Sequence, residues 1–330
     1  MSRAGGETPY HVARERVALA DLSHQATVLL SGADRVSWLQ QLISNDLDLL
    51  TPDRGLSSLL LSAKGKTQAM FYIYRQPSVF ILETEQEDVA LLMASLLRYK
   101  LRSKIEVTQP PWSKFLIAGP LARTLLGCFL EQSLPDMQER SYFQSGEFFC
   151  IQRSLTGERD YLLYLPSAQQ DTVWERLLRL GKEMGIEPVD DTMRERLRIE
   201  AGIPRWGKEI TESVFPIETG LDEAISYTKG CYPGQEVMAR IRTYGHVNRR
   251  LVGLILGETQ PPQEGVRLIR DGEDVGWITS VTDSPALCRM IAMGYVREAA
   301  SAAGTDLSIA ETALKAQVVA LPFLSQQTSP

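Results

Sequence analysis

The sequence predicts an α+β protein made of two lobes with largely antiparallel sheets, followed by a small β-barrel. In the first lobe, several short strand patterns lead into one long amphipathic helix, which is typical of helices packed on an antiparallel sheet. A similar alternation follows Pro110-Pro111. The last part of the chain holds short strands separated by turn signals, as in small barrels. We therefore expect domains at 1–110, 111–245 and 246–330, with exchange of segments between the first two left open.

The first lobe is predicted from short strands and two helices. Asp34 is expected to cap a helix in which Val36, Leu39 and Ile43 fall on one face. Thr84 and Glu87 have the spacing of a capping box, which predicts that the second helix begins after Thr84. The expected strands of this lobe are 28–30, 56–62, 70–74, 79–82 and 105–107.

The second lobe and the barrel follow from the same signals. A hairpin tip is expected at Thr156–Asp160, and Asp271-Gly272 is a hairpin turn signal in the barrel. The stretch 205–245 is expected to be irregular. In the second lobe we expect strands at 115–118, 147–154 and 161–165 and helices at 120–130, 168–184 and 191–201. In the barrel we expect strands at 251–256, 266–270, 275–281, 288–296 and 316–320. The first eight residues and the tail after Phe323 are polar, and we expect them to be poorly ordered.

Charge and composition exclude several classes of protein. The 330 residues carry 35 basic and 41 acidic side chains, a net charge of −6. This balance argues against a general nucleic-acid-binding protein and leaves room for a local basic patch. No apolar run is long enough to span a bilayer, and the N-terminus does not resemble a secretory signal. We therefore expect a cytoplasmic protein with no direct nucleic-acid or membrane partner.

Cysteine and histidine usage agrees with that location. Four cysteines lie far apart and form no CxxC pair, so we expect reduced thiols rather than disulfides. Cys128, Cys150 and Cys288 lie in apolar surroundings and are expected in the core. Three histidines are too few and too scattered to indicate a histidine-based metal site, and no metal is expected.

The octet Lys229–Glu236 (KGCYPGQE) is the stretch whose residues are hardest to replace. Gly230 and Gly234 allow a sharp turn or a close approach of the backbone to a ligand. An ammonium close to a thiol favours the thiolate, the form of cysteine that attacks electrophiles and binds metals. We therefore interpret the octet as a shaped loop with Cys231 and Lys229 as candidate catalytic residues. The alternative is a turn that happens to contain a cysteine.

Three further residues are candidates for binding a ligand. Glu158 lies at the expected hairpin tip, where a carboxylate is either solvated or accepts two N–H bonds from an amino-pyrimidine edge. Arg194 and Arg198 are four residues apart and share a helix face. They can form ordinary ion pairs with Glu195 and Glu200, or they can bind a flat anionic ligand.

With these residues in view, the chain resembles the glycine-cleavage T-proteins (aminomethyltransferases) over nearly its full length. The octet is more selective and resembles the signature of the folate-binding YgfZ branch, which is associated with iron–sulfur cluster assembly or repair. The segments that carry the wider resemblance are Gly32-Ala33-Asp34, Asn45-Asp46, Thr156-Gly157-Glu158 with Tyr161, Arg198–Pro204, Val275–Ser280 and Leu321-Pro322-Phe323.

The resemblance implies a three-domain ring around a pocket for tetrahydrofolate. Glu158 would face the pterin ring, and Arg194 falls where T-proteins place a folate-contacting arginine, with Arg198 on the same helix face. Cys231 and Lys229 would face the pocket as the pair specific to the branch. The implied partners are a reduced folate and iron–sulfur client or assembly proteins, and the implied oligomeric state is a monomer.

Two departures from the T-protein pattern bear on the reaction. The position of the catalytic aspartate is occupied by Met70, and no acidic residue occurs between Asp53 and Glu83. A thioether cannot act as a general base, so aminomethyl transfer from glycine is not expected. Asp160 stands where the family prefers glycine, which puts the hairpin turn in question.

Three functions remain open from the sequence. The first is a tetrahydrofolate-binding accessory protein for iron–sulfur cluster assembly or repair that uses the Cys231 thiol. The second is a folate-dependent one-carbon transferase or demethylase, which needs a general base from elsewhere in the chain. The third is a non-catalytic scaffold. Met70 leaves it open whether the protein is an enzyme.

Overall fold

The computed structural model describes residues 9–87, 89–245, 247–257, 261–312 and 314–324. The expectations for the first eight residues, for His246 and for the end of the tail lie outside these residues. The described residues form two compact units, which are considered separately. The first is drawn from Met1–Trp38, Leu47–Leu56 and Phe71–Arg194, and the second from Leu39–Asp46, Ser57–Met70 and Glu195–Pro330.

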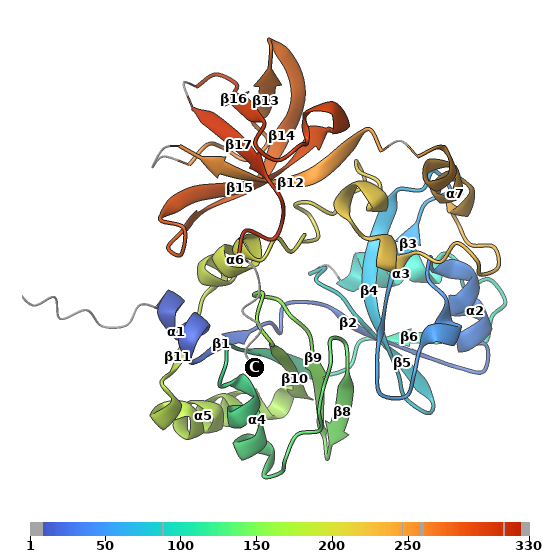
Figure 1. Cartoon of the computed structure of the whole chain (residues 1–330). Helices are drawn as coiled ribbons and strands as arrows, with labels where there is room; N and C mark the ends of the chain where they lie inside the picture. Colours follow the sequence, from blue (N-terminus) through green and yellow to red (C-terminus); the bar gives the residue numbers. More distant parts are fainter. Residues whose placement is uncertain (1–8, 88, 246, 258–260, 313, 325–330) are drawn as a thin grey trace, which may run out of the picture. The chain divides into compact units, whose positions relative to one another are not determined.

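The first unit contains a six-stranded sheet in the order β11-β1-β7-β10-β9-β8 (Figure 1). Its pairs are antiparallel except for β1 with β11. Phe115 and Leu163 of the sheet form a buried core with Leu125 of α4 and Leu177 of α5. The elements are α1 (Pro9–Glu15), β1 (Val17–Asp21), β7 (Trp112–Ala118), α4 (Ala122–Leu130), β8 (Tyr142–Ser145), β9 (Phe148–Gln152), β10 (Tyr161–Pro166), α5 (Gln170–Gly181) and β11 (Ile186–Pro188).

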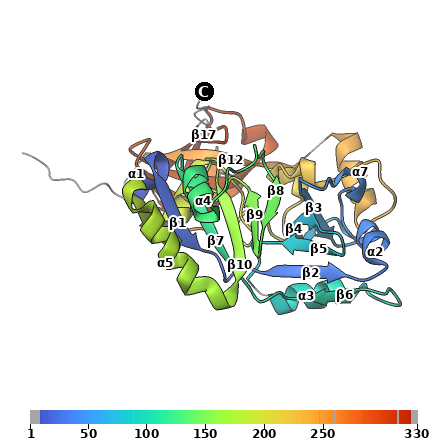
Figure 2. The same ribbon diagram turned by 90° about the horizontal axis from the view of Figure 1, so that it is seen from below.

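A second sheet has five strands in the order β3-β4-β5-β2-β6. The helix α3 packs along β2 and β6 at one end of this order (Figure 2). The elements are β2 (Thr27–Ser31), α2 (Arg35–Leu42), β3 (Leu56–Leu61), β4 (Thr67–Arg75), β5 (Val79–Glu83), α3 (Val89–Leu97) and β6 (Glu106–Thr108).

The C-terminal part of the second unit is a closed barrel in the order β12-β15-β14-β13-β16-β17 (Figure 1). Its interior is filled by apolar residues such as Leu254, Leu268, Ile278 and Val318. The elements are α6 (Asp191–Glu200), α7 (Gln235–Tyr244), β12 (Arg249–Leu256), β13 (Arg267–Arg270), β14 (Glu273–Ser284), β15 (Arg289–Arg297), β16 (Asp306–Ile309) and β17 (Lys315–Val319).

These elements confirm the predicted α+β class, the largely antiparallel sheets and the C-terminal barrel. Asp271 and Gly272 connect β13 to β14, as expected for the hairpin turn. The ring arrangement and the three domain boundaries stay predictions.

Several local predictions were wrong. The helix expected after Thr84 begins at Val89, because the Thr84 hydroxyl accepts the nearby Gln86 amide at 3.2 Å in a local turn. The stretch 205–245 is not irregular throughout, since α7 begins within the octet at Gln235. Val36 was expected on the same helix face as Leu39 and Ile43, but 38% of it is exposed, whereas the other two are buried. The elements α1, β1, β8, β11 and β16 were not predicted.

Candidate functional site

The octet is fixed in the second unit by two of its own residues. Gly234 has φ = +80°, and a Cβ atom there would lie 2.7 Å from the carbonyl oxygen of Ser62, so this position requires glycine. The Tyr232 ring is buried, and its hydroxyl donates a hydrogen bond to the carbonyl of Ser226 at 3.0 Å. The octet therefore has a defined backbone path that leads directly into α7.

Lys229 connects the octet to the end of α2. Its side chain is nearly buried, with 8% of the residue exposed, and its ammonium donates to the carbonyls of Gln40, Ile43 (2.8 Å) and Asn45 (2.8 Å). The last carbonyls of a helix lack intrahelical donors, and a lysine is well suited to satisfy them. The structure thus gives Lys229 a stabilising role, and its catalytic role beside Cys231 stays a prediction.

Cys231 is exposed, whereas Lys229 before it and Tyr232 after it are buried. Cys150 is buried on β9 as expected, and burial raises the pKa of its thiol. The expectation that Cys128 and Cys288 lie in the core was wrong, because both are exposed. Cys128 lies on the outer side of α4, and Cys288 lies in the turn before β15. All four cysteines are free thiols.

Met70, the residue at the position of the expected catalytic aspartate, lies on β4. Its side chain packs against the apolar cluster that contains Tyr232 of the octet and Met238 of α7. Met70 and the octet therefore belong to one packed region of the second unit. A thioether in apolar surroundings cannot accept a proton, so Met70 cannot serve as a general base.

Glu158 lies in the first unit, between β9 and β10. Its carboxylate pairs with the guanidinium of Arg14 on α1 at 3.1 Å, and the same guanidinium donates to the carbonyl of Thr156 at 3.1 Å. About a third of the Glu158 side chain (31%) is exposed. The sequence could not indicate this ion pair, because α1 was not predicted.

Asp160 resolves the question about the hairpin turn. Its carboxylate is fully buried and accepts hydrogen bonds from the amides of Leu155 (2.7 Å) and Thr156 (2.8 Å) and from the Thr156 hydroxyl. Burial raises the pKa of Asp160 to about 7, against the lowering effect of these hydrogen bonds. The aspartate therefore holds the turn together from inside.

The two candidate arginines of α6 lie in different environments. Arg194 pairs with the exposed carboxylate of Asp191, three residues earlier. Arg198 is nearly buried and donates to Glu195, to Glu209 at 2.8 Å and to the Ser280 hydroxyl at 2.8 Å. Burial alone would raise the pKa of Glu195, but the hydrogen bonds and charge of Arg198 hold that pKa below its usual value.

Glu209 is a buried carboxylate that the sequence analysis missed. It accepts hydrogen bonds from Thr279 and Ser280 at 2.6 and 2.7 Å in addition to the pair with Arg198. These partners are 70 and 71 residues away along the chain, and no short motif contains them.

The five predicted site residues are divided between the two units. Glu158 and Arg194 belong to the first unit, and Arg198, Lys229 and Cys231 belong to the second.

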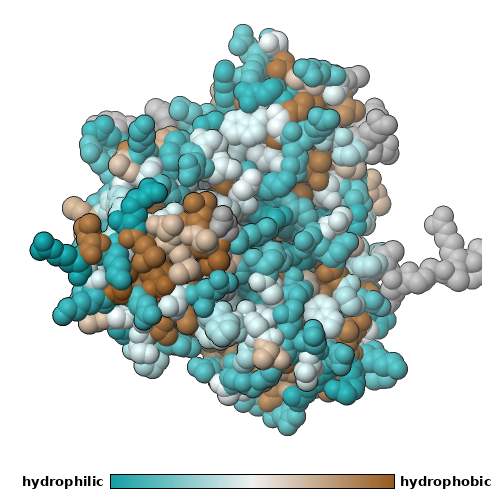
Figure 3. All heavy atoms as spheres, turned by 180° about the vertical axis from the view of Figure 1, so that it is seen from behind, coloured by the Kyte–Doolittle hydropathy of each residue, from teal (hydrophilic) through white to brown (hydrophobic). Residues whose placement is uncertain are grey.

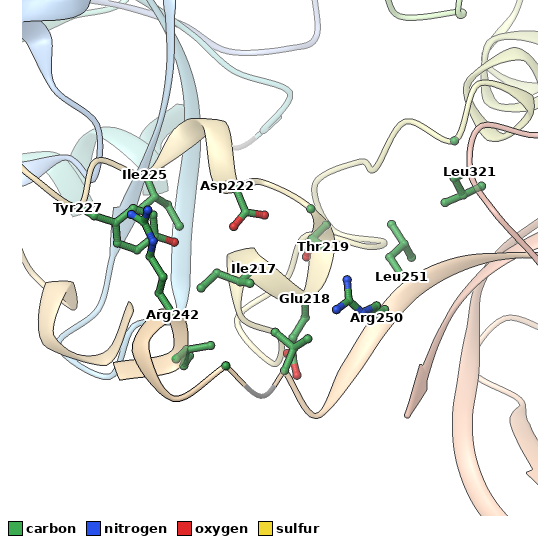
Figure 4. Close-up of a pocket in the computed structure, with 15 residues that line it drawn as sticks. Ile217, Glu218, Thr219, Asp222, Ile225, Tyr227, Arg242, Arg250, Leu251 and Leu321 are labelled. Atoms are coloured by element: carbon green, nitrogen blue, oxygen red, sulfur yellow. The ribbon is translucent and has the colours of Figure 1, made fainter. Parts of the chain in front are cut away.

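A pocket of about 770 Å³ lies in the second unit (Figure 4). Ile217 and Tyr227 belong both to its wall and to the apolar cluster below the octet. The guanidinium of Arg242 stacks over the Tyr227 ring at 4.1 Å, and Asp222 is also part of the wall. None of the five predicted site residues is among the described residues that line it. Its lining is spread from residue 202 to 321, which explains why no motif indicated it.

Within the described residues, no helix combines the length and the apolar character needed to cross a membrane.

Two models of known protein families together match almost the whole chain. Residues 4–229 match the GCVT N-terminal domain, and residues 249–324 match the glycine cleavage T-protein C-terminal barrel domain. The second match coincides with the closed barrel formed by β12–β17.

Similar proteins cover the chain from end to end. An aminomethyltransferase of Shouchella clausii is 27% identical over 334 residues, with 98% of this chain and 90% of the relative covered. An aminomethyltransferase of Bacillus subtilis is 28% identical over 324 residues, with 95% and 89% covered. The crystal structure of glycine cleavage system aminomethyltransferase T from Bartonella henselae has the same fold, with a TM-score of 0.89 at 24% identity over 96% of this chain and 89% of that one. The two domain matches and the shared fold place the chain in the glycine cleavage T-protein family.

Proposed function

We propose that this chain binds a reduced folate, tetrahydrofolate, and that its reacting group is the Cys231 thiol rather than a carboxylate on β4. The observation that carries the proposal is the contrast between Cys231 and Met70. The cysteine is exposed on a loop with a fixed backbone, whereas Met70 packs in an apolar cluster at the place where the family resemblance puts the catalytic aspartate.

The fixed loop suits a thiol that must meet a second molecule. Lys229, Tyr232 and Gly234 hold the backbone on both sides of Cys231 through buried contacts. A reacting group works best when its supports are rigid, because little ordering remains to be done when the partner arrives. The flanking buried residues thus position the thiol, and the exposed sulfur is free to react.

Folate binding is proposed from family membership together with three polar side chains. Glu158 is expected to accept the amino-pyrimidine edge of the pterin, and Arg194 is expected to contact the anionic part of the ligand. The Asp191 partner of Arg194 is exposed, so a folate carboxylate can replace it at little cost. Arg198 is committed to two carboxylates and contributes by holding α6 in place.

The finer assignment rests on the octet. Its resemblance to the YgfZ signature supports an accessory protein for iron–sulfur cluster assembly or repair. Clusters are usually held by four thiolates, so Cys231 alone cannot hold one without ligands from a partner. We therefore propose a cytoplasmic monomer that meets iron–sulfur client or assembly proteins, with domains at 1–110, 111–245 and 246–330.

Replacing Cys231 by alanine is expected to abolish the function and leave the fold intact. In a strain that lacks the gene, the Cys231→Ala protein should restore no more activity of iron–sulfur enzymes than an empty vector. Cys128→Ala is the matched control, because it removes another exposed thiol and should restore full activity. Equal amounts of folded protein would be verified by immunoblot and circular dichroism. Full restoration by Cys231→Ala would exclude the thiol as the reacting group.

A second candidate function is one-carbon transfer on the folate, as a transferase or demethylase. It is favoured by family membership and by relatives named aminomethyltransferase that match the chain over nearly its full length. It requires a general base other than Met70. Formation of methylene-tetrahydrofolate from an N-methyl donor by the purified protein would support it, and no turnover over a broad panel of donors would exclude it. A scaffold would show neither turnover nor dependence on Cys231.

A further inference from the structure

The turn between α3 and β6 carries a dense positive charge on an acidic protein. Arg98, Lys100, Arg102 and Lys104 alternate with other residues in the segment RYKLRSK, while the whole chain has a net charge of −6. Within the described part of the chain, no carboxylate forms an ion pair with any of these four side chains. Arg98, Arg102 and Lys104 are exposed and Lys100 is half-buried, so the turn presents its positive charge to solvent.

Leu101 lies at the tip of this turn in an unfavourable state. It is 91% exposed and has φ = +45°, a left-handed conformation that costs a residue with a Cβ about 1 kcal/mol or more. Leu97, one turn earlier at the end of α3, is also exposed, at 38%. An exposed leucine in a strained conformation gains nothing for the folded chain itself, so it points to a contact with another molecule.

The turn is rigid. The amides of Tyr99, Lys100 and Ser103 donate hydrogen bonds to the carbonyls three residues before each of them, at 2.9–3.1 Å. The Trp38 indole donates to the carbonyl of Tyr99 at 2.9 Å.

The far end of the turn is held by the segment that precedes α2. Asp34 accepts the amide of Lys104 at 2.7 Å. Gly32 approaches so closely that a Cβ atom on it would lie 2.2 Å from the carbonyl oxygen of Lys104. Leu101 and its flanking charges are thus presented in one defined geometry.

We propose that residues 97–104 form a docking turn for an acidic segment of a partner protein. Leu101 would enter an apolar pocket of the partner, and carboxylates around that pocket would pair with Arg98 and Arg102. Complementary charge and a preformed geometry are the features that give such contacts their specificity. This inference is independent of folate and of Cys231, because none of the residues proposed for those roles belongs to the turn.

Other occupants fit the turn less well. A single leucine tip with one neighbour offers too little apolar area for stable insertion into a bilayer. The aromatic residue of the turn, Tyr99, is half-buried and offers no free face for stacking bases. Figure 3 shows hydrophobic side chains gathered at the left of the face opposite to that of Figure 1, with mostly hydrophilic side chains over the rest of that face. The net charge of −6 opposes approach to any extended polyanion.

The test introduces the photo-reactive amino acid p-benzoylphenylalanine at Leu101 of the full chain in living cells. Leu49, which is 64% exposed and also lies in the first unit, is the matched control position. We expect an adduct with a defined acidic protein from position 101 and no such adduct from position 49. The same adducts at both positions, no adduct, or an adduct with nucleic acid or lipid would overturn the proposal.

The adduct partner would then be purified and its affinity measured. Arg98→Glu combined with Arg102→Glu is expected to raise the dissociation constant at least about tenfold, whereas Arg179→Glu on the exposed face of α5 should leave it unchanged. Leu101→Gly removes both the strain and the side chain, so it should weaken binding without lowering the unfolding temperature. Unchanged affinity in the double variant or in Leu101→Gly would contradict a docking role.

Discussion

Replacing Glu83 by glutamine is expected to lower the free energy of unfolding by about 3–5 kcal/mol, because it leaves the buried Lys114 without a counter-ion and the buried Arg153 with Glu85 alone. Glu83 lies at the end of β5 with no exposed surface. Its carboxylate accepts the Lys114 ammonium at 3.0 Å and the Arg153 guanidinium, and each of these side chains is only 2% exposed. Glutamine has nearly the same shape, so the loss comes from charge and hydrogen bonding rather than from a cavity.

Lys114 and Arg153 also determine how the stability that Glu83 contributes depends on pH. Burial alone would raise the pKa of Glu83, but Arg153 and Lys114 outweigh it and hold this pKa below the usual value. A carboxyl group whose folded pKa is lowered contributes stability above its unfolded pKa and loses it as the pH falls through the folded pKa. The Glu83→Gln protein should therefore lose less stability than the wild type when the pH is lowered from neutral into that range.

Unfolding in urea at neutral and acidic pH measures both effects. Glu85→Gln is the matched control, since Glu85 is partly exposed and contacts Arg153 at 3.3 Å. Its effect should be smaller than that of Glu83→Gln, because the Glu85 carboxylate reaches solvent and Glu83 remains to pair with Arg153. Equal effects of the two substitutions would show that the buried charges of this cluster do not depend on Glu83.

Replacing Lys229 by methionine is expected to cost about 2–4 kcal/mol, because three carbonyls at the end of α2 lose their common donor. The ammonium has three N–H groups and meets three acceptors, on Gln40, Ile43 and Asn45. Methionine fills much of the same volume, but it cannot donate a hydrogen bond. Part of the loss is recovered because a charge no longer needs to be buried.

Hydrogen exchange locates this effect and urea unfolding gives its size. The amides of residues 40–46 and of the octet should exchange faster in Lys229→Met, while those of the barrel should be unchanged. Lys208→Met is the matched control, because Lys208 pairs with Glu264 at a partly exposed site of the same unit. If both variants are equally stable and exchange alike, Lys229 does not connect the octet to α2.

The sequence predicted the elements whose signals are local. The helices α4, α5 and α6 and most barrel strands have clear periodicity and are bounded by turn residues, so their positions agree with expectation to within a few residues. The strand β1 was missed because its short apolar run follows directly on the helix α1, and periodicity cannot separate two such short elements.

Contacts between distant segments could not be predicted. Glu83 meets Lys114 and Arg153 across 31 and 70 residues of sequence, and Arg14 meets Glu158 across 144. Each of these side chains alone is typical of a solvated surface. Pairing is visible only after the sheets have brought the segments together.

In the candidate site, too, some features were predicted from local motifs and others depend on contacts between distant segments. The octet, Met70 and the α6 arginines were recognised from short motifs, and the structure places Met70 on β4, the arginines on α6 and the octet in the loop that leads into α7. The role of Lys229 at the end of α2, the turn held by Asp160 and the buried Glu209 depend on partners that no motif contains. Motifs thus identified which residues are candidates for the site, but only the packed structure shows what each side chain contacts.

We propose that the chain binds a reduced folate through Arg194 of α6. Calorimetric titration of tetrahydrofolate into the wild type, Arg194→Ala and Arg196→Ala tests it most directly. Arg196 lies on the same helix and pairs with Asp283 instead, which makes it the matched control. We predict saturable binding that Arg194→Ala weakens by about tenfold or more and Arg196→Ala leaves unchanged. No binding to the wild-type protein, or equal weakening by both substitutions, would contradict the claim.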